Sequence, residues 1–332
     1  MDPKVILTGF ADEGPTGKSV EAQLAMCRGL GLSYYSPRFV NLGGGAKNLM
    51  AADDDELSQL RDLHDAYEMK VSSIGSPIGK VKLMDVDDGT SNRYVPFETY
   101  LETEVAHAIE VSQYLGAKLI RGFSFYPPRD DEPMAHIELA AGYLRAIAER
   151  CADAGLIYGL EVEANLVGRD GRTEMALYEA VSHDNLMLIF DGANIACQGY
   201  SRDQVYAEYQ AMKPGIGWMH VKDYQLADGA QQAGHIDEES LWRFVPCDRG
   251  TSGYAQILAD FRAELPALTA KLQARGIPGV FLDLEPHLKG GGQFGGFSGC
   301  DGFGVALRVL CGVLDAVGIS YDRTIYGDLK RA

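Results

Sequence analysis

The sequence lacks several features that would each mark a different class of protein. Its 332 residues carry 30 Lys and Arg against 47 Asp and Glu, a formal net charge of −17, and no run of basic residues. Nucleic acids and anionic membrane surfaces attract basic patches, so neither is an expected partner. None of the 6 cysteines forms a C-x-x-C pair. Scattered thiols in a chain of this size indicate reduced, mostly buried cysteines.

Targeting signals and nucleotide-binding motifs are also missing. The first residues, MDPKVILTGFADEG, contain no basic stretch followed by an apolar core, so no secretory signal is predicted. No apolar run approaches the roughly 20 residues that span a bilayer, and we therefore expect a cytoplasmic protein. The stretch TGFADEGPTGK after the first predicted strand matches neither G-x-G-x-x-G nor G-x-x-x-x-G-K-[ST]. This argues against a doubly wound nucleotide-binding fold.

Short apolar runs alternate with longer amphipathic segments along the whole chain. The apolar runs predict strands at residues 4–10, 32–40, 70–76, 117–125, 156–164, 185–191, 215–223 and 279–285. The segments between them predict helices at residues 19–30, 53–68, 97–115, 132–154, 172–182, 204–212, 254–275 and 304–317. Strands that alternate with helices favour a parallel sheet, and this many units without a linker favour a single (β/α)8 TIM barrel over residues 1–332.

Acidic or imidazole side chains stand at the carboxyl ends of the last four predicted strands, where a barrel places its active site. They are Glu161 with Glu163, then Asp191, then His220 with Asp223, and finally Glu285 with His287. One such residue alone is more often a hydrogen-bonded core or cap residue. Carboxylates crowded on adjacent strands, however, repel one another unless a cation holds them. The set Glu, Asp, His, Glu suits one Mn²⁺ or Mg²⁺ ion, with Co²⁺ and Zn²⁺ as alternatives.

The segments around these residues resemble the xylose isomerase-like TIM barrel superfamily of sugar isomerases and epimerases. They are LEVEAN at 160–165, FDGAN at 190–194, MHVKD at 219–223 and LDLEP at 282–286. The loop PCDRGTSGY at 246–254 is similar to a further P-x-G-x-G loop of the superfamily. Asp248 stands there where Gly is commoner, which leaves a phosphate or hydroxyl contact in this loop open. The N-terminal half agrees only in its β–α rhythm.

The resemblance implies that Glu161, Asp191, His220 and Glu285 hold a divalent metal ion and that the substrate is a small carbohydrate. It also implies proton transfer through a metal-bound cis-enediolate, with Glu161 and Glu285 flanking the substrate as catalytic base and acid. Glu163 falls where xylose isomerase carries a catalytic lysine. We expect this glutamate either beside the substrate or as a partner of the metal site.

Further residues near these segments are candidates for substrate contacts, and most have a simpler alternative. Lys222 shares a strand face with His220 and is expected to reach the substrate. Asn194 can bind a hydroxyl group or cap the next helix. Asp223, Arg249 and His287 can instead form a loop hydrogen bond, a surface ion pair and the end of a strand, respectively.

The Gly-rich segment at 289–304 follows the last predicted strand and is expected near the active-site mouth. We expect a lid in which Phe294, Phe297 and Phe303 exclude water. A phosphate cradle or a subunit contact fits the same composition. Because dimers and tetramers are common for such barrels, we also expect a homo-oligomer.

The predicted activity is therefore isomerisation or epimerisation of a sugar, a ketose or a sugar phosphate. A lyase that dehydrates a keto-inositol-like substrate would use the same metal site. A phosphodiesterase of the endonuclease IV type would need several histidine ligands, and the chain has only 7 histidines. A glycosidase would need only two carboxylates, which would leave Asp191 and His220 unexplained. A sugar-binding barrel without activity would be expected to have lost one or two of the ligands.

Overall fold

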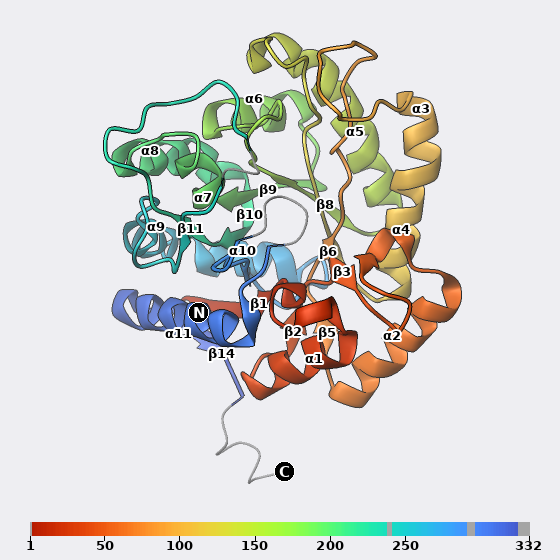
Figure 1. The fold of residues 1–332 in the computed structure, drawn as a ribbon, viewed down its shortest axis with the longest axis vertical. Coiled ribbons are helices and arrows are strands. Elements are labelled where there is room, and N and C mark those ends of the chain that lie inside the picture. The colour runs from red at the N-terminus through yellow and green to blue at the C-terminus, as the bar shows by residue number, and fades with distance from the viewer. Residues whose placement is uncertain (1, 238–240, 291–295, 325–332) are drawn as a thin grey trace.

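The computed structural model describes residues 2–237, 241–290 and 296–324 and confirms the predicted TIM barrel (Figure 1). The barrel strands are β1 (Lys4–Gly9), β2 (Tyr34–Tyr35), β5 with β6 (Lys70–Val71 and Ile74–Gly75), β7 (Leu119–Gly122), β8 (Ile157–Glu161), β9 (Leu186–Asp191), β10 (Ile216–Val221) and β13 (Phe281–Leu284). Neighbours pair in parallel in the order β1, β13, β10, β9, β8, β7, β6, and β2 pairs in parallel with β5. The backbone N–H of Ser36 donates to the carbonyl of Gly9 at 2.9 Å, which joins β2 to β1.

Helices lie around the outside of the strands (Figure 1). They are α1 (Val20–Gly29), α2 (Asp54–Tyr67), α3 (Phe97–Tyr100), α4 (Ala106–Tyr114), α5 (Ile137–Asp153), α6 (Gly171–Val181), α7 (Gly192–Ala196), α8 (Arg202–Met212), α9 (Tyr254–Phe261), α10 (Leu265–Gln273) and α11 (Gly299–Val317). Short strands outside the barrel are β3 (Phe39–Val40), β4 (Lys47–Asn48), β11 (Asp223–Tyr224), β12 (Phe244–Val245) and β14 (Ser320–Asp322). In the described part of the chain, no helix is long and apolar enough to cross a membrane.

The start of α2 shows how local sequence fixes a helix boundary. The side chain of Asp53 accepts a hydrogen bond from the backbone N–H of Glu56 at 2.9 Å, and the side chain of Glu56 accepts one from the backbone N–H of Asp53 at 3.0 Å. This reciprocal cap satisfies two donors that the first turn of a helix leaves free. Acidic side chains in the same turn also interact favourably with the helix dipole.

Two predicted helix boundaries were wrong, and several short elements were not predicted. The helix expected at 254–275 is divided into α9 and α10, because Pro266 lies in the first turn of α10 and cannot continue a preceding helix. Helix α11 begins at Gly299 rather than at residue 304. Strand β14 pairs with β1, so the first and last described strands of the chain lie side by side (Figure 1). Helix α7, which follows β9 directly, was also not predicted.

A large aromatic residue fills the barrel beneath its mouth. Trp218 of β10 is 1% exposed, and a Cβ atom at Gly159 of β8 would lie 2.1 Å from its ring. Gly159 is therefore required for the close approach of this ring. Residues two apart in a strand share a face, so His220 and Glu161 lie one step further toward the mouth. The ring of Trp218 thus forms an apolar floor beneath them.

Candidate metal centre

Side chains from adjacent strands meet inside the mouth of the barrel. Glu161 ends β8, Asp191 ends β9, His220 lies in β10, and Glu285 follows β13. All four are buried, and one potential ligand atom from each lies within 4.8 Å of the others. In the pairing of β9 with β10, His220 is opposite Asp191, so the two side chains stand at the same level. The structure therefore brings together the residues that the sequence singled out.

Hydrogen bonds orient this cluster. His220 Nδ1 lies 2.9 Å from Glu161 Oε1, and Asn194 Nδ2 donates to the same oxygen at 3.2 Å. Asp191 Oδ1 accepts from the backbone N–H groups of Ala193 and Asn194 at 2.9 and 3.2 Å. The cap of α7 is thus Asp191, and the prediction of Asn194 as a helix cap was wrong. The amide of Asn194 instead holds Glu161 in place.

Two atoms that face the cluster are donors suited to a cation. His220 Nδ1 lies 2.9 Å from Glu161 Oε1 and 4.0 Å from Glu285 Oε2. Asp191 Oδ2 is buried, and its partner in the described residues is the ammonium of Lys222. Imidazole nitrogen and carboxylate oxygen are both donors to divalent ions, so the residues fit a metal ion. Lys222 also contributes positive charge here, since its Nζ lies 3.1 Å from Asp191 Oδ2 and 2.7 Å from Glu285 Oε2.

Two arginines that the sequence reasoning missed contact the cluster from the other side of the barrel. Arg38, in the loop after β2, forms a buried ion pair with Glu285. Arg121 of β7 has its Nη1 3.3 Å from Glu161 Oε2. Both follow short apolar runs, in the segments SPRFV and LIRGF. A search for charged residues at the ends of the first strands, as was made for the last ones, would have found them.

The three carboxyl groups of the cluster differ in pKa, because the charges beside them differ. Burial opposes ionisation of each of them. At Glu285, two adjacent basic side chains outweigh burial and hold the pKa well below its usual value. At Glu161, His220 outweighs burial and also lowers the pKa. At Asp191, burial dominates and raises the pKa to about 7.

A cleft opens over the cluster, with a volume of about 440 Å³ when the space open to solvent is counted. Lys222 and Glu285 form part of its wall, so the cluster is accessible from this side. Glu163 also lines the cleft, and its carboxylate lies 3.0 Å from Nζ of Lys80. The position that carries a catalytic lysine in xylose isomerase is therefore a glutamate here. A lysine from a different loop, Lys80, brings an ammonium group beside it.

Three further residues were predicted as candidates for substrate contacts, and one of them lines the cleft. His287 lines the cleft, and its Nδ1 lies 2.9 Å from a carboxylate oxygen of Glu13. Asp223 Oδ1 accepts hydrogen bonds from the N–H and the hydroxyl of Ser252 at 3.0 and 2.6 Å. Arg249 is exposed and lies 3.5 Å from the neighbouring aspartate. Neither of these two lines the cleft, so the structure favours the loop hydrogen bond and the surface ion pair.

The described part of the Gly-rich segment places one of its three phenylalanines in the core rather than in a lid. Phe303 is 0% exposed, and a Cβ atom at Gly9 of β1 would lie 2.7 Å from its ring, so Phe303 belongs to the core. Phe297 is half-buried, and its N–H donates to the carbonyl of Gly290 at 2.8 Å. Phe294 lies outside the described residues. The prediction of a lid was wrong for Phe303 and is not tested for Phe294.

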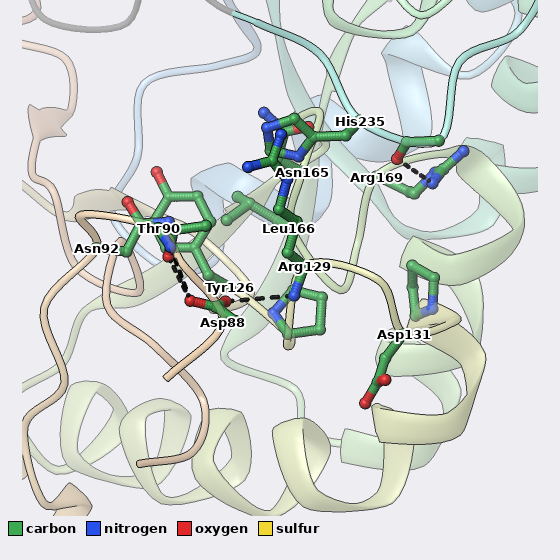
Figure 2. A pocket seen from close by; sticks show the side chains of 13 residues that line it. Asp88, Thr90, Asn92, Tyr126, Arg129, Asp131, Asn165, Leu166, Arg169 and His235 are labelled. Atoms are coloured by element: carbon green, nitrogen blue, oxygen red, sulfur yellow. Dashed lines mark hydrogen bonds between the residues drawn. The ribbon is translucent and has the colours of Figure 1, made fainter. Parts of the chain in front are cut away.

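A second, polar cleft is drawn in Figure 2. Figure 2 shows Asp88 accepting hydrogen bonds from Thr90 and from the backbone of Arg129. Phe123, Tyr126 and Leu166 form a small apolar cluster. Phe123 lines the first cleft, whereas the other two line the second. This apolar cluster therefore separates the two clefts.

Known structures share this architecture. The probable 3-DHS dehydratase AsbF from Bacillus anthracis is 18% identical, with a TM-score of 0.61 over 93% of this chain and 98% of that one. The IOLI protein with a bound zinc atom is 14% identical, with a TM-score of 0.65 over 94% and 99%. D-Psicose 3-epimerase with D-tagatose from Clostridium cellulolyticum H10 is 12% identical, with a TM-score of 0.60 over 94% and 99%. No curated protein matches the sequence. The sequence profile of the xylose isomerase-like TIM barrel family matches residues 25–289, and the chain therefore belongs to this family.

Proposed function

We propose that the chain is a divalent-metal-dependent isomerase or epimerase acting on a small hydroxy-carbonyl carbohydrate. The observation that carries this proposal is the buried convergence of Glu161, Asp191, His220 and Glu285 beneath an open cleft. The two glutamates stand on the outer strands of this group of four, β8 and β13, with β9 and β10 between them. A substrate above the cluster would therefore have a carboxylate on each side.

The four residues would hold the ion, which, when bound, supplies a Lewis acid that polarises the substrate carbonyl. Glu161 is ionised at neutral pH because its pKa is lowered, as a general base must be. It would accept the proton from the carbon next to the carbonyl, while the C–H electron pair forms the double bond of an enediolate. A proton from the ammonium of Lys222, which lies 2.7 Å from Glu285, would then pass through Glu285 to the opposite face of that carbon, or to the adjacent carbon. General acid–base catalysis of this kind contributes about 10²–10⁴-fold.

The relatives named above support this choice without fixing the substrate. One is an epimerase crystallised with a ketose, and another holds a metal ion. A shared fold alone does not specify a reaction. The proposal therefore depends on the residues of the site.

A lyase is the second candidate, and the position of Lys222 favours it. Loss of water from a hydroxy-carbonyl compound needs an acid for the departing hydroxyl group as well as a base. The ammonium of Lys222 lies 2.7 Å from Glu285 at the wall of the cleft, where it can donate that proton. A dehydratase is also among the structural relatives.

A phosphodiesterase with several metal ions receives less support. In the described part of the chain, the one other cluster of possible ligands is Glu13, Glu285 and His287. Arg38 already contacts Glu285 and lies 3.5 Å from Glu13. This second cluster is therefore neutralised by an arginine.

Proton exchange with solvent tests the proposal. The protein would be incubated in D₂O with Mn²⁺ and a panel of ketoses and ketose phosphates, and the products followed by NMR and mass spectrometry. We expect metal-dependent deuterium incorporation next to the carbonyl, together with a new sugar of the same composition. Loss of one water molecule would instead identify the lyase. Neither exchange nor dehydration with Mn²⁺, Mg²⁺, Co²⁺ or Zn²⁺ would contradict both functions.

A further inference from the structure

Arg121 presents a buried guanidinium group that is held by aromatic rings. The residue is 7% exposed. The centre of its guanidinium lies 5.0 Å from the ring centroid of Phe10 and 4.8 Å from that of Phe123. Contacts with ring faces fix the position of a guanidinium without using its N–H donors.

Most of these donors have no good acceptor in the described residues. A guanidinium has five N–H groups. Nη1 of Arg121 is 3.3 Å from Glu161, Nη2 is 3.4 Å from the carbonyl of Ser76, and Nε has no acceptor. Both contacts are longer than the 2.7–2.9 Å that is typical of charge-assisted hydrogen bonds. A buried charge with unused donors is costly unless a further acceptor is bound.

Arg38 provides the contrast within the same site. It too stacks on Phe10, with its guanidinium centre 4.6 Å from the ring centroid. Its terminal nitrogens, however, contact Glu285 and lie 3.2 Å from Asp12. Arg38 is therefore neutralised inside the protein, whereas in the described residues the one ion-pair partner of Arg121 is Glu161. A divalent ion on Glu161 would take up that charge as well.

Arg121 also lines the cleft over the cluster, beside Lys80 and Phe123. Nζ of Lys80 lies 4.3 Å from the ring centroid of Phe123 on the same wall and is paired with the carboxylate of Glu163 at 3.0 Å. We propose that Arg121 binds an oxyanion of the substrate, a carboxylate or a phosphate. The planar guanidinium matches two oxygens of either group. Resting on the proposed function for the reaction itself, this inference makes the substrate an acidic hydroxy-carbonyl compound rather than a neutral ketose.

Equilibrium binding tests this inference without turnover. Dihydroxyacetone, hydroxypyruvate and dihydroxyacetone phosphate are small hydroxy-carbonyl probes that are neutral, carboxylate-bearing and phosphate-bearing, respectively. Their dissociation constants would be measured by ligand-observed NMR titration, with and without Mn²⁺. We expect at least one anionic probe to bind about tenfold or more tightly than the neutral one, the gain typical of one charge-assisted hydrogen bond. The stronger of the two anions identifies the group.

Variants locate the contact. Arg121→Gln should lose the preference for the anion, and Arg121→Lys should keep part of it, with circular dichroism confirming that both fold. Arg129→Gln, in the second cleft, is the matched control and should keep the full preference. Equal binding of all three probes, no binding of either anion, or loss of the preference in the Arg129 variant instead would overturn the inference. If the preference is present but no proton exchange occurs, the proposed function fails and the anion site stands.

Discussion

The two halves of the barrel mouth differ in charge. Strands β8, β9, β10 and β13 contribute the acidic and imidazole side chains of the cluster, whereas the loops and strands from β2 to β7 contribute Arg38, Lys80 and Arg121. Lys222 is an exception in the first half, and the buried carboxylates Asp12 and Glu13 follow β1, between the two halves. The comparison shows that the acidic half alone would be repulsive, and that the basic half both balances it and faces the cleft.

Removing a charge from the acidic half should have the largest effect. In Glu161→Gln the side chain keeps its shape but can no longer accept a proton or neutralise Arg121. We expect the rate of solvent-deuterium exchange to fall by about 10²–10⁴-fold, as for the loss of a general base. Glu179→Gln, an exposed change on α6, is the control. An unchanged exchange rate in Glu161→Gln would show that another group removes the proton.

Strand β1 lies between the two halves, and Phe303 packs against it at Gly9. Because Phe303 is 0% exposed, Phe303→Ala should destabilise the fold by about 3–5 kcal/mol, measured by urea unfolding. Phe297→Ala, at a half-buried position, is the matched control and should lower the free energy of unfolding by less. A Phe303 variant of normal stability but low activity would restore the lid hypothesis.

Within the acidic half, Asn194 holds Glu161 without contacting the cleft. We expect Asn194→Ala to weaken Mn²⁺ binding about 10–100-fold, the usual effect of removing a hydrogen bond that orients a ligand. Isothermal titration calorimetry would measure this. Asn185→Ala is the control. Asn185 precedes β9, whereas Asn194 follows it, and the side chain of Asn185 donates to the carbonyl of Leu156 at 2.6 Å, at the other end of the strand. Equal Mn²⁺ affinity in the two variants would remove Asn194 from the site.

Glu174 shows what happens to a buried carboxyl group without a nearby cation. It is 0% exposed, neither oxygen has a hydrogen-bond partner in the described residues, and burial raises its pKa well above the usual value. A carboxyl pKa raised by folding means that stability is lost as pH rises from the unfolded-state value of about 4.3 toward the folded-state value. Glu174→Gln removes this loss.

Thermal unfolding measures the effect of Glu174→Gln. We expect Tm of the variant, relative to the unchanged protein, to rise between pH 5 and pH 8, by about 1.5 °C for each kcal/mol of stability that the carboxyl group loses. The exposed Glu179→Gln on the same helix should show no such pH dependence. A difference in Tm that does not change with pH would mean that folding does not raise the pKa of Glu174.

The barrel strands and the acidic cluster were predictable because both depend on local patterns. An apolar run shows where a strand lies, and its last residue shows what reaches the mouth. Helix α7 was not predicted, because it has only 5 residues and because its cap, Asp191, was already interpreted as a ligand. A single residue can fill both roles when one carboxylate oxygen caps the helix and the other faces the cluster.

The basic half was not predicted because its contacts are distant in sequence. Arg38 and Glu285 are separated by 247 positions, and only closure of the barrel brings them together. The apolar periodicity of the two segments predicts a strand in each, but it does not show that Arg38 and Glu285 will meet. The residue types at the ends of the strands indicate which side chains are candidates, but the partner of each depends on the order of strands around the barrel.

Metal content is the most direct test of the central claim that the acidic half is a metal centre. The unchanged protein, His220→Ala and the exposed control His235→Ala would each be purified without chelator, loaded with Mn²⁺, desalted and measured by elemental analysis. The account predicts about one equivalent of metal in the unchanged protein and in the control, and loss of that metal in His220→Ala. No metal in the unchanged protein, or equal metal in all three, would contradict it.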